Sequence, residues 1–578
     1  MTHIPAPRSI DRVAPPARRA GAARWFALDA LLVLGVLAVH AFWPVPEPNE
    51  PYYLAKARHF WEPQWLAGDF FLSTADSHWV FYALFGWPML WLAPASYAWC
   101  GRWFTWFLLA IAWTRLSRAV VGAEQRTWSP LDAPSSCTLQ GSERLEGCRD
   151  ASIGTARVAA VAPVVGWAGL TAAAFVALNS WVSPAGEWVV GGFEAKSLAY
   201  VLVLWALAAL VRDRWPSVWP LLGAATSLHV LVGGWSVLAA VLTWLSLGRE
   251  RPTVASQLPY LALGTLLALP GLWPAVALSW GIDASLVQRA AEIHVYRRVS
   301  HHMLPQDFVP AQSALFLAVG GVWLAALWRG GVSGPTRRLA RFAAAVAGLA
   351  LVGGAIALVA HWQPAWAANW LRFYWFRLVD VVLPLACVFT LASWSQRQWF
   401  ARPRAARGLV VLLLLVGGTH LVGLSVYRGF QPWARADAGK VADVTDWRDA
   451  CAWIARETPP DARFLTPFRG HTFKWYAERS EVANWKETPQ DAAAIVEWWQ
   501  RMQSIYRRTE GGGRQWPVAE LAELSTERVL ELGRMYDAQF VLTVREPELA
   551  LERAYENNSY VVYRLGDQRP IATEERLP

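Results

Sequence analysis

The chain has 578 residues, of which 55% are hydrophobic and only 17% are charged, and its mean hydropathy is +0.23. Because soluble globular domains carry about 25% charged residues, this composition excludes an ordinary soluble enzyme. The net charge of +9 is divided into +13 for residues 1–429 and −4 for residues 430–578. Since the basic residues lie in short runs between apolar stretches, the charge indicates a membrane protein and not a nucleic-acid-binding protein.

Residues 26–429 form an expected transmembrane domain, between a basic cytoplasmic segment (1–25) and a soluble domain (430–578). A membrane-spanning helix needs about 20 apolar residues, and the apolar stretches predict about eleven of them. The first stretch is expected to remain as an anchor, because no small-residue cleavage site closes it. The expected spans are 26–44, 99–116, 157–179, 197–211, 217–231, 234–248, 257–279, 313–328, 341–361, 373–394 and 408–427.

Arginine residues predict which side of the membrane each connection faces. With a cytoplasmic N-terminus, the basic connections all fall on the cytoplasmic side, as the positive-inside rule requires. The loop 45–78 and the domain 430–578 are then extracytoplasmic, in a multi-pass protein of a bacterial-type inner membrane. Residues 79–95 are apolar enough to span, but a crossing there would invert every later connection. We therefore expect an interfacial or re-entrant helix at this segment. The basic connections contain Arg118, Arg126, Arg144 and Arg149, then Arg212 and Arg214, Arg249 and Arg251, Arg329, Arg337, Arg338 and Arg341, and finally Arg397, Arg402, Arg404 and Arg407.

The C-terminal region predicts an α/β or α+β domain. Helices are expected at 446–457, 489–509 and 519–533, the first of them capped by Thr445 or Asp446. Strands are expected at 462–466, 540–544 and 560–565, where β-branched and aromatic residues gather. The predicted fold class is therefore a polytopic α-helical membrane protein with a C-terminal extracytoplasmic α/β or α+β domain.

Polar residues gather in the connections expected on the outer side, and such residues at membrane depth mark candidate sites. The first group lies in the loop 45–78, where Glu50 directly follows the first span and Asp69 comes later. A carboxylate at the edge of a low-dielectric groove can act as a general base toward an incoming hydroxyl. The alternative is a solvated acid in a loop.

A second group, Glu187, Glu194 and Lys196, surrounds a Gly-Gly turn between the third and fourth spans. The two carboxylates are suited to a divalent cation or to substrate hydroxyls, and the lysine to a phosphate. The alternative is anchoring at the membrane interface by Trp188 and a snorkelling Lys196. His229, in the next outer hairpin, is either a site residue or a structural histidine.

The third group lies in the loop 280–312, which is basic although it is expected outside. It contains Arg297, Arg298, His301 and His302. Arginine binds phosphate through a planar fork, so this loop predicts an anionic ligand. An anion is favoured over a zinc ion here, because adjacent histidines are expected to point apart and the loop lacks cysteines. Arg372, near the tenth span, joins this group as a ligand-binding residue or, with Asp380, as part of an ion pair.

Several motifs are absent from the sequence. It contains no P-loop, no G-x-G-x-x-G before a helix, no H-E-x-x-H and no G-x-S-x-G. Nucleotide cofactors are therefore not expected, and a divalent cation at Glu187 and Glu194 is the one cofactor left open. The expected partners are membrane lipids and a lipid-phosphate-bound substrate, without nucleic acid.

The segment NEPYYLAKAR, residues 49–58, resembles the acidic motif that opens the first outer loop of the C-type (GT-C) glycosyltransferases. That class includes the lipid A aminoarabinose transferases and the protein mannosyltransferases. The segment FYALFG (81–86), with Arg102 after it, is also similar to these families. So are the C-terminal segments DWR (446–448), TPPDA (458–462) and YVVYRL (560–565).

The resemblance implies a glycosyltransferase that moves a sugar from a polyprenyl-phosphate donor to an extracytoplasmic acceptor. Asn49 stands where these families have a leading aspartate, which leaves Glu50 as the implied catalytic base. The families' proline-rich element is replaced by DSHWVFY, residues 76–82. Arg297, Arg298 and His301 would stabilise the leaving phosphate. The alternatives are a transporter or flippase of lipid-linked substrates, or a non-catalytic membrane assembly protein.

Overall fold

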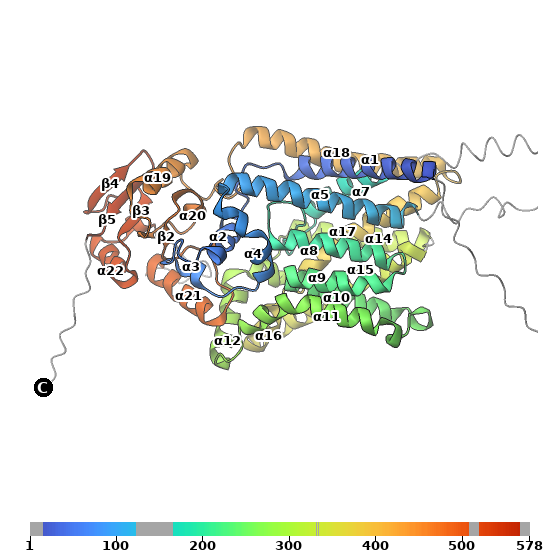
Figure 1. Ribbon diagram of the computed structural model, residues 1–578, viewed down its shortest axis with the longest axis horizontal. Coiled ribbons are helices and arrows are strands. Elements are labelled where there is room, and N and C mark those ends of the chain that lie inside the picture. Colours follow the sequence, from blue (N-terminus) through green and yellow to red (C-terminus); the bar gives the residue numbers. More distant parts are fainter. Residues whose placement is uncertain (1–15, 123–165, 331, 333, 508–519, 567–578) are drawn as a thin grey trace, which may run out of the picture.

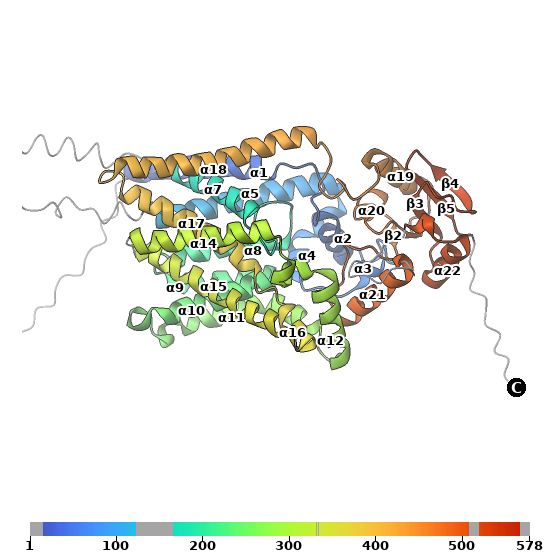
Figure 2. The ribbon, with the colours of Figure 1, turned by 180° about the vertical axis from the view of Figure 1, so that it is seen from behind.

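The computed structural model describes residues 16–122, 166–330, 332, 334–507 and 520–566. Its helices form a long bundle, and a smaller domain made of a sheet and helices lies at one end of that bundle (Figure 1). Figure 2 shows the same two parts from behind. Most of the basic segment 1–25 and of the connection 117–156 lies outside the described residues.

Eleven helices in the described part of the chain make up the bundle. Each overlaps most of one of the expected apolar stretches, with ends that differ by a few residues, and for 157–179 only the part from residue 166 is described. The helices are α1 (Pro16–Ala41), α5 (Pro94–Val120), α7 (Trp167–Trp181), α8 (Ala195–Leu210), α9 (Trp215–Leu228), α10 (Val230–Ser246), α11 (Val254–Ala277), α14 (Pro310–Gly330), α15 (Gly334–Val359), α17 (Arg377–Arg397) and α18 (Pro403–Phe430).

Six of these helices, α1, α11, α14, α15, α17 and α18, are long and apolar enough to cross a membrane. The chain is therefore a multi-pass membrane protein, and a total of eleven crossings stays a prediction. The apolar window of α17 is 89% buried, whereas that of α14 is 6% buried. Helix α17 thus lies in the middle of the bundle, and α14 offers its apolar side chains to lipid, with its backbone groups bonded within the helix.

Short helices connect the bundle at the end that faces the C-terminal domain. Residues 79–90 form two of them, and neither is long enough to span a membrane. The two short helices agree with the expectation that the segment 79–95 does not cross the membrane. The short elements at this end are α2 (Glu50–Trp61), α3 (Phe70–Ser73), α4 (Trp79–Phe85), η1 (Trp87–Leu90), α12 (Ala284–Glu292), η5 (Ile293–Arg298), α13 (Ser300–Met303), η6 (Pro305–Asp307) and α16 (Pro364–Leu371). At the opposite end of the bundle, η4 (Gly248–Glu250) connects α10 to α11.

The C-terminal domain contains a five-stranded sheet in the order β2-β1-β3-β5-β4. Strands β2, β1 and β3 run parallel, and β3, β5 and β4 are antiparallel neighbours. The three expected strands are confirmed, whereas β2 and β4 had no clear signal in the sequence. The elements are α19 (Val444–Glu457), β1 (Arg463–Leu465), α20 (Phe473–Ala477), β2 (Ser480–Glu481), α21 (Ala492–Tyr506), η7 (Leu521–Glu523), α22 (Thr526–Tyr536), β3 (Phe540–Val544), β4 (Glu552–Glu556) and β5 (Tyr560–Arg564).

Helices cover both faces of this sheet. Apolar residues of α21 and α22 pack on one face, and those of α19 and α20 pack on the other. Helix α19 begins earlier than expected, because the cap is Asp443, whose Oδ1 accepts a hydrogen bond from the Asp446 amide at 2.9 Å. The prediction of Thr445 or Asp446 as the cap is therefore wrong.

Candidate active site

A cavity of about 1130 Å³ lies between the end of the bundle and the C-terminal domain. Residues near the C-terminal ends of α1, α7, α11 and α18 line it, together with residues near the N-terminal ends of α8, α10 and α17. These helix ends therefore share one end of the bundle. The connections that contain Arg212, Arg249 and Arg402 join the opposite helix ends, so they lie away from the cavity.

Charged side chains of both signs line the cavity, with cations in excess. The cations are Lys196, Arg298, Arg372, Arg377, Arg435 and Lys486, and the carboxylates are Glu47, Glu187 and Glu194. A concave surface with low-dielectric walls concentrates the field of such charges. Six cations against three carboxylates therefore make this cavity attractive to an anionic ligand.

Glu194 lies directly before α8 and faces the cavity. Its Oε2 accepts a hydrogen bond from Asn49 Nδ2 at 3.1 Å, and its Oε1 is buried with no hydrogen-bond partner among the described residues. Burial raises the pKa of the Glu194 carboxyl to about 7, against the opposing effect of Lys196. A carboxylate with such a pKa and a free acceptor oxygen has the properties of a general base at neutral pH.

Glu187 forms a second charged group with Lys196 and Arg377. Its Oε2 lies 3.8 Å from Lys196 Nζ and 3.5 Å from Arg377 Nε, and its Oε1 accepts a hydrogen bond from the Tyr200 hydroxyl at 3.2 Å. The Lys196 ammonium also lies 3.7 Å from the centre of the Trp188 ring, which is a cation–π contact. Lys196 therefore contacts Trp188 and lines the cavity, and its binding of a phosphate stays a prediction.

A divalent cation, which the sequence left open at Glu187 and Glu194, does not fit this arrangement. Among the described residues, no group of three or more His, Cys, Asp or Glu side chains is placed to hold a metal ion. Calcium and magnesium need several oxygen ligands, whereas Lys196 and Arg377 already supply positive charge beside Glu187. The group is better suited to the hydroxyls of a ligand.

Arginine and aromatic side chains form the part of the cavity wall that begins at Arg377, beside Glu187. The Arg377 guanidinium lies 4.0 Å from the centre of the Tyr374 ring, and the Tyr374 hydroxyl lies 3.1 Å from His294 Nε2. Arg298, from the π-helical turn η5, and Arg372 also line this wall. The buried Nε of Arg372 has no hydrogen-bond partner among the described residues. These guanidinium groups can bind a phosphate that enters the cavity.

Eight of the site residues predicted from the sequence line this one cavity, namely Glu187, Glu194, Lys196, His229, Arg298, His301, His302 and Arg372. Arg297 is exposed and is not part of the lining. His229 has a structural role as well, because its Nδ1 accepts a hydrogen bond from the first turn of α10 at 3.2 Å.

The expectation that His301 and His302 point apart is wrong. Their ring centres lie 4.0 Å apart. The ring of His302 is held by the Ala185 carbonyl, which lies 2.7 Å from its Nδ1.

Glu50 lies behind the cavity wall and does not line the cavity. Its side chain is 0% exposed and faces Arg102 of α5, with an Nε–Oε1 distance of 2.7 Å and an Nη2–Oε2 distance of 2.5 Å. The backbone amides of Glu47 and Phe193 also donate to its two oxygens, at 2.8 and 2.9 Å. All of these donors hold the carboxylate in place, so the geometry does not favour the general-base role expected for Glu50.

Asp69 is also placed apart from the cavity. It is fully buried and pairs with Lys474 of the C-terminal domain, at 2.9 Å between Oδ2 and Nζ. Its Oδ1 accepts a hydrogen bond from the Leu72 amide at 3.0 Å and so caps α3. Asp69 therefore joins the loop 45–78 to the C-terminal domain, and it does not meet the other predicted site residues.

The lining also contains residues that were not among the predicted site residues, and Tyr52, His78, Tyr374 and Lys486 are examples. Tyr52 and His78 belong to the loop 45–78, which the sequence had already marked as a candidate region of the site. Asp76 Oδ1 lies 2.7 Å from His78 Nδ1 and orients its ring. No feature of the sequence marked Lys486 as a site residue. It lies in the C-terminal domain and lines the cavity only because that domain packs against the end of the bundle.

Comparison with known proteins gives limited matches. Residues 445–505 match the model of a domain of unknown function, DUF6798. No curated protein sequence matches the chain. Among solved structures, the chain is similar to the cryo-EM structure of the arabinofuranosyltransferase AftD from Mycobacteria, with a TM-score of 0.43 and 14% identity. The similarity covers 94% of this chain and 42% of that one, so this chain spans less than half of its length. The TM-score is too low for this similarity to carry an argument about activity.

Proposed function

We propose that this protein is a C-type membrane glycosyltransferase that moves a sugar from a polyprenyl-phosphate donor to an extracytoplasmic acceptor. The observation that carries the proposal is the excess of cations around Glu194, in a cavity at the ends of apolar helices. A lipid phosphate brings negative charge to that depth, and wall residues such as Leu231, Leu278 and Leu424 suit an apolar chain. The basic connections at the opposite end of the bundle support an extracytoplasmic position of the cavity.

In the proposed reaction, an acceptor hydroxyl attacks the anomeric carbon of the donor sugar. The new carbon–oxygen bond forms while the bond from the anomeric carbon to the phosphate oxygen breaks, and the bonding electron pair leaves with the lipid phosphate. Glu194 takes the proton of the hydroxyl. Arg298, Arg372 and Arg377 stabilise the negative charge of the leaving phosphate, and Glu187 binds sugar hydroxyls.

This proposal assigns the base to Glu194 in place of Glu50. A base needs a free oxygen within reach of the substrate proton. Glu194 has a buried oxygen without a protein partner in a cavity-lining side chain. Both oxygens of Glu50 accept hydrogen bonds from Arg102 and from backbone amides. Glu50 is assigned the role of holding α2 against α5 below the site.

The test is release of polyprenyl phosphate by the purified full-length protein, supplied with a panel of polyprenyl-phosphate-linked sugars. We expect turnover by the parent protein and a loss of about 10²–10⁴-fold in Glu194→Gln, with donor binding retained. Glu62→Gln, an exposed acid in the loop 45–78, is the matched control and should turn over normally.

Three results would overturn the proposal. Binding and transbilayer movement of the lipid without cleavage would identify a flippase. The absence of both binding and turnover would favour an assembly protein. Normal turnover in Glu194→Gln would show that Glu194 is not the base.

A further inference from the structure

Residues 484–491, here called the roof segment, extend from the C-terminal domain into the cavity. They connect β2 to α21 without regular secondary structure. Lys486, Thr488 and Gln490 of this segment line the cavity beside residues of the bundle. Because no ladder of backbone hydrogen bonds fixes such a segment, its side-chain contacts must determine where Lys486 lies.

Polar contacts join the roof segment to the bundle and to the loop 45–78. Arg298 Nε donates a hydrogen bond to Thr488 Oγ1 at 2.7 Å. Gln490 Oε1 accepts hydrogen bonds from the backbone amide and the hydroxyl of Ser77, at 3.0 and 2.7 Å. Within the segment, Asn484 Oδ1 accepts from the amides of residues 486 and 487, at 2.9 and 3.0 Å. These contacts hold the segment over the cavity.

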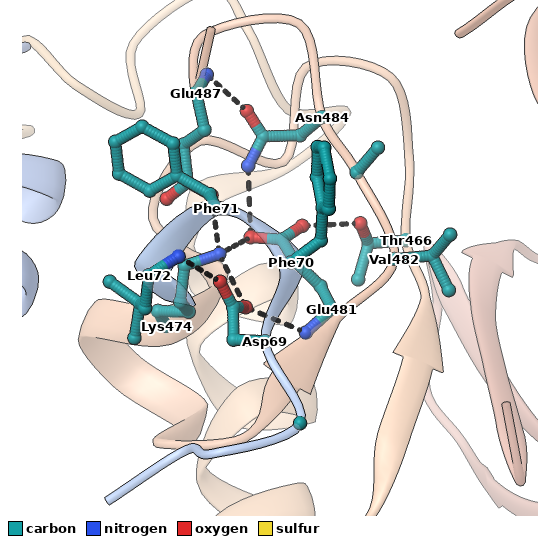
Figure 3. Close-up of polar contacts among 12 residues, drawn as sticks. Asp69, Phe70, Phe71, Leu72, Thr466, Lys474, Glu481, Val482, Asn484 and Glu487 are labelled. Carbon is teal, nitrogen blue, oxygen red and sulfur yellow. Dashed lines mark hydrogen bonds and ion pairs between the residues drawn. The ribbon is translucent and has the colours of Figure 1, made fainter. Parts of the chain in front are cut away.

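A buried ionic cluster around Lys474 holds the base of the roof segment (Figure 3). Lys474 Nζ lies 2.9 Å from Asp69 Oδ2 and 2.7 Å from Glu481 Oε1, and it also contacts Glu487 Oε2. All four side chains are at most 3% exposed. Asn484 Nδ2 donates to Glu481 Oε1 at 2.8 Å. The cluster thus ties the roof segment to Asp69 of the loop 45–78.

The charges of this cluster are strongly coupled. Three carboxylates share the Lys474 ammonium, and burial raises the pKa of the Glu487 carboxyl, with Glu481 and Asp69 adding to the effect. Lys474 supplies the positive charge of this cluster, so its removal would leave buried carboxylates without a partner, which is strongly destabilising. The cluster therefore holds the roof segment in one position more firmly than surface contacts would.

Lys486 stands at the inner side of the roof segment. Its ammonium lies 5.8 Å from the centre of the Tyr52 ring and is affected by the charges of Arg298 and Glu194. Burial and the neighbouring cations lower the pKa of Lys486 to about 7. A bound anion close to Lys486 would favour the charged form of this lysine.

We propose that the roof segment completes the binding site, in which Lys486 contacts the phosphate of the substrate and the Lys474 cluster is the anchor that positions Lys486. The inference rests on the proposed function and extends it to the C-terminal domain. The match to the domain of unknown function, residues 445–505, contains the roof segment together with Lys474, Glu481 and Glu487. The role assigned to this part of the chain is to close the cavity over the lipid phosphate.

The first experiment measures equilibrium binding of undecaprenyl phosphate to the full-length protein in detergent. Lys486→Met should weaken binding about tenfold or more, the loss typical of a hydrogen bond to a charged group. Lys486→Arg should bind nearly as the parent does. Lys440→Met is the matched control, because Lys440 is a lysine of the same region that does not line the cavity. Unchanged binding in Lys486→Met, or an equal loss in Lys440→Met, would overturn the contact.

The second experiment tests the anchor through a double-mutant cycle. Glu487→Gln keeps the size of the side chain, and its melting temperature is recorded to confirm that the protein is folded. If the cluster acts through Lys486, Glu487→Gln weakens binding in the parent and adds little in the Lys486→Met background. Additive losses in the two variants, or no loss in Glu487→Gln, would overturn the positioning role.

Failure of this inference is distinct from failure of the proposed function. If the parent does not bind undecaprenyl phosphate, the proposed function is overturned as well. If the parent binds the lipid and releases it from the linked sugar while Lys486→Met does the same, only the roof-segment inference is wrong.

Discussion

The Glu50→Gln variant tests whether Glu50 holds the structure together or performs the chemistry. In the folded protein, two donors of Arg102 and two backbone amides point at the Glu50 carboxylate, and neither Glu50 nor Arg102 is exposed. A glutamine keeps one acceptor oxygen and presents an NH₂ group to the other two donors. Each buried donor without an acceptor costs about 1–3 kcal/mol, and loss of one partner from a buried ion pair costs about 3–5 kcal/mol.

We therefore expect Glu50→Gln to lower the free energy of unfolding by about 3–5 kcal/mol. The assay is thermal unfolding of the purified variants in detergent, with Glu62→Gln as the exposed control. The pair Glu50→Gln with Arg102→Met should recover part of the loss, because no buried charge then remains unpaired. A Glu50→Gln protein that melts like the parent but has no transferase activity would refute this reasoning. Glu50 would then be assigned as the general base.

Three further predictions concern pH, packing and topology. The transfer rate should rise as the pH passes upward through about 7, since the ionised form of Glu194 is the base; the rise should vanish in Glu194→Gln, and its persistence there would exclude Glu194 as its origin. Gly192→Ala should destabilise the protein by about 1–3 kcal/mol, because the new Cβ would lie 2.9 Å from Glu50 Cγ and from Glu47 Cβ; an unchanged melting temperature would contradict this packing. A reporter that works only outside the cytoplasm should be active when fused after residue 430 and inactive within 117–156, and the reverse pattern would invert the proposed orientation.

The sequence by itself determined the bundle and the general region of the site. Apolar stretches predicted all of the bundle helices, because helices are the simplest structures that satisfy backbone groups within lipid. Strands β3 and β5 were also predicted, since buried β-branched and aromatic residues mark them locally. Polar residues stand out against an apolar background, so Glu187, Glu194 and Arg298 were recognised before their contacts were known.

Only the tertiary structure decided where each of these side chains lies and what it contacts. Strand β2 has two residues and exists through its pairing with β1, so no periodic pattern precedes it. The resemblance implied Glu50 as the base, but in the structure Glu50 pairs with Arg102, and Glu194 lines the cavity. Lys486 lines the cavity although it belongs to the C-terminal domain, which is joined to the loop 45–78 by the Lys474–Asp69 ion pair. Burial and charge pairing arise between residues far apart in the chain, and a linear pattern of residue types does not contain those distances.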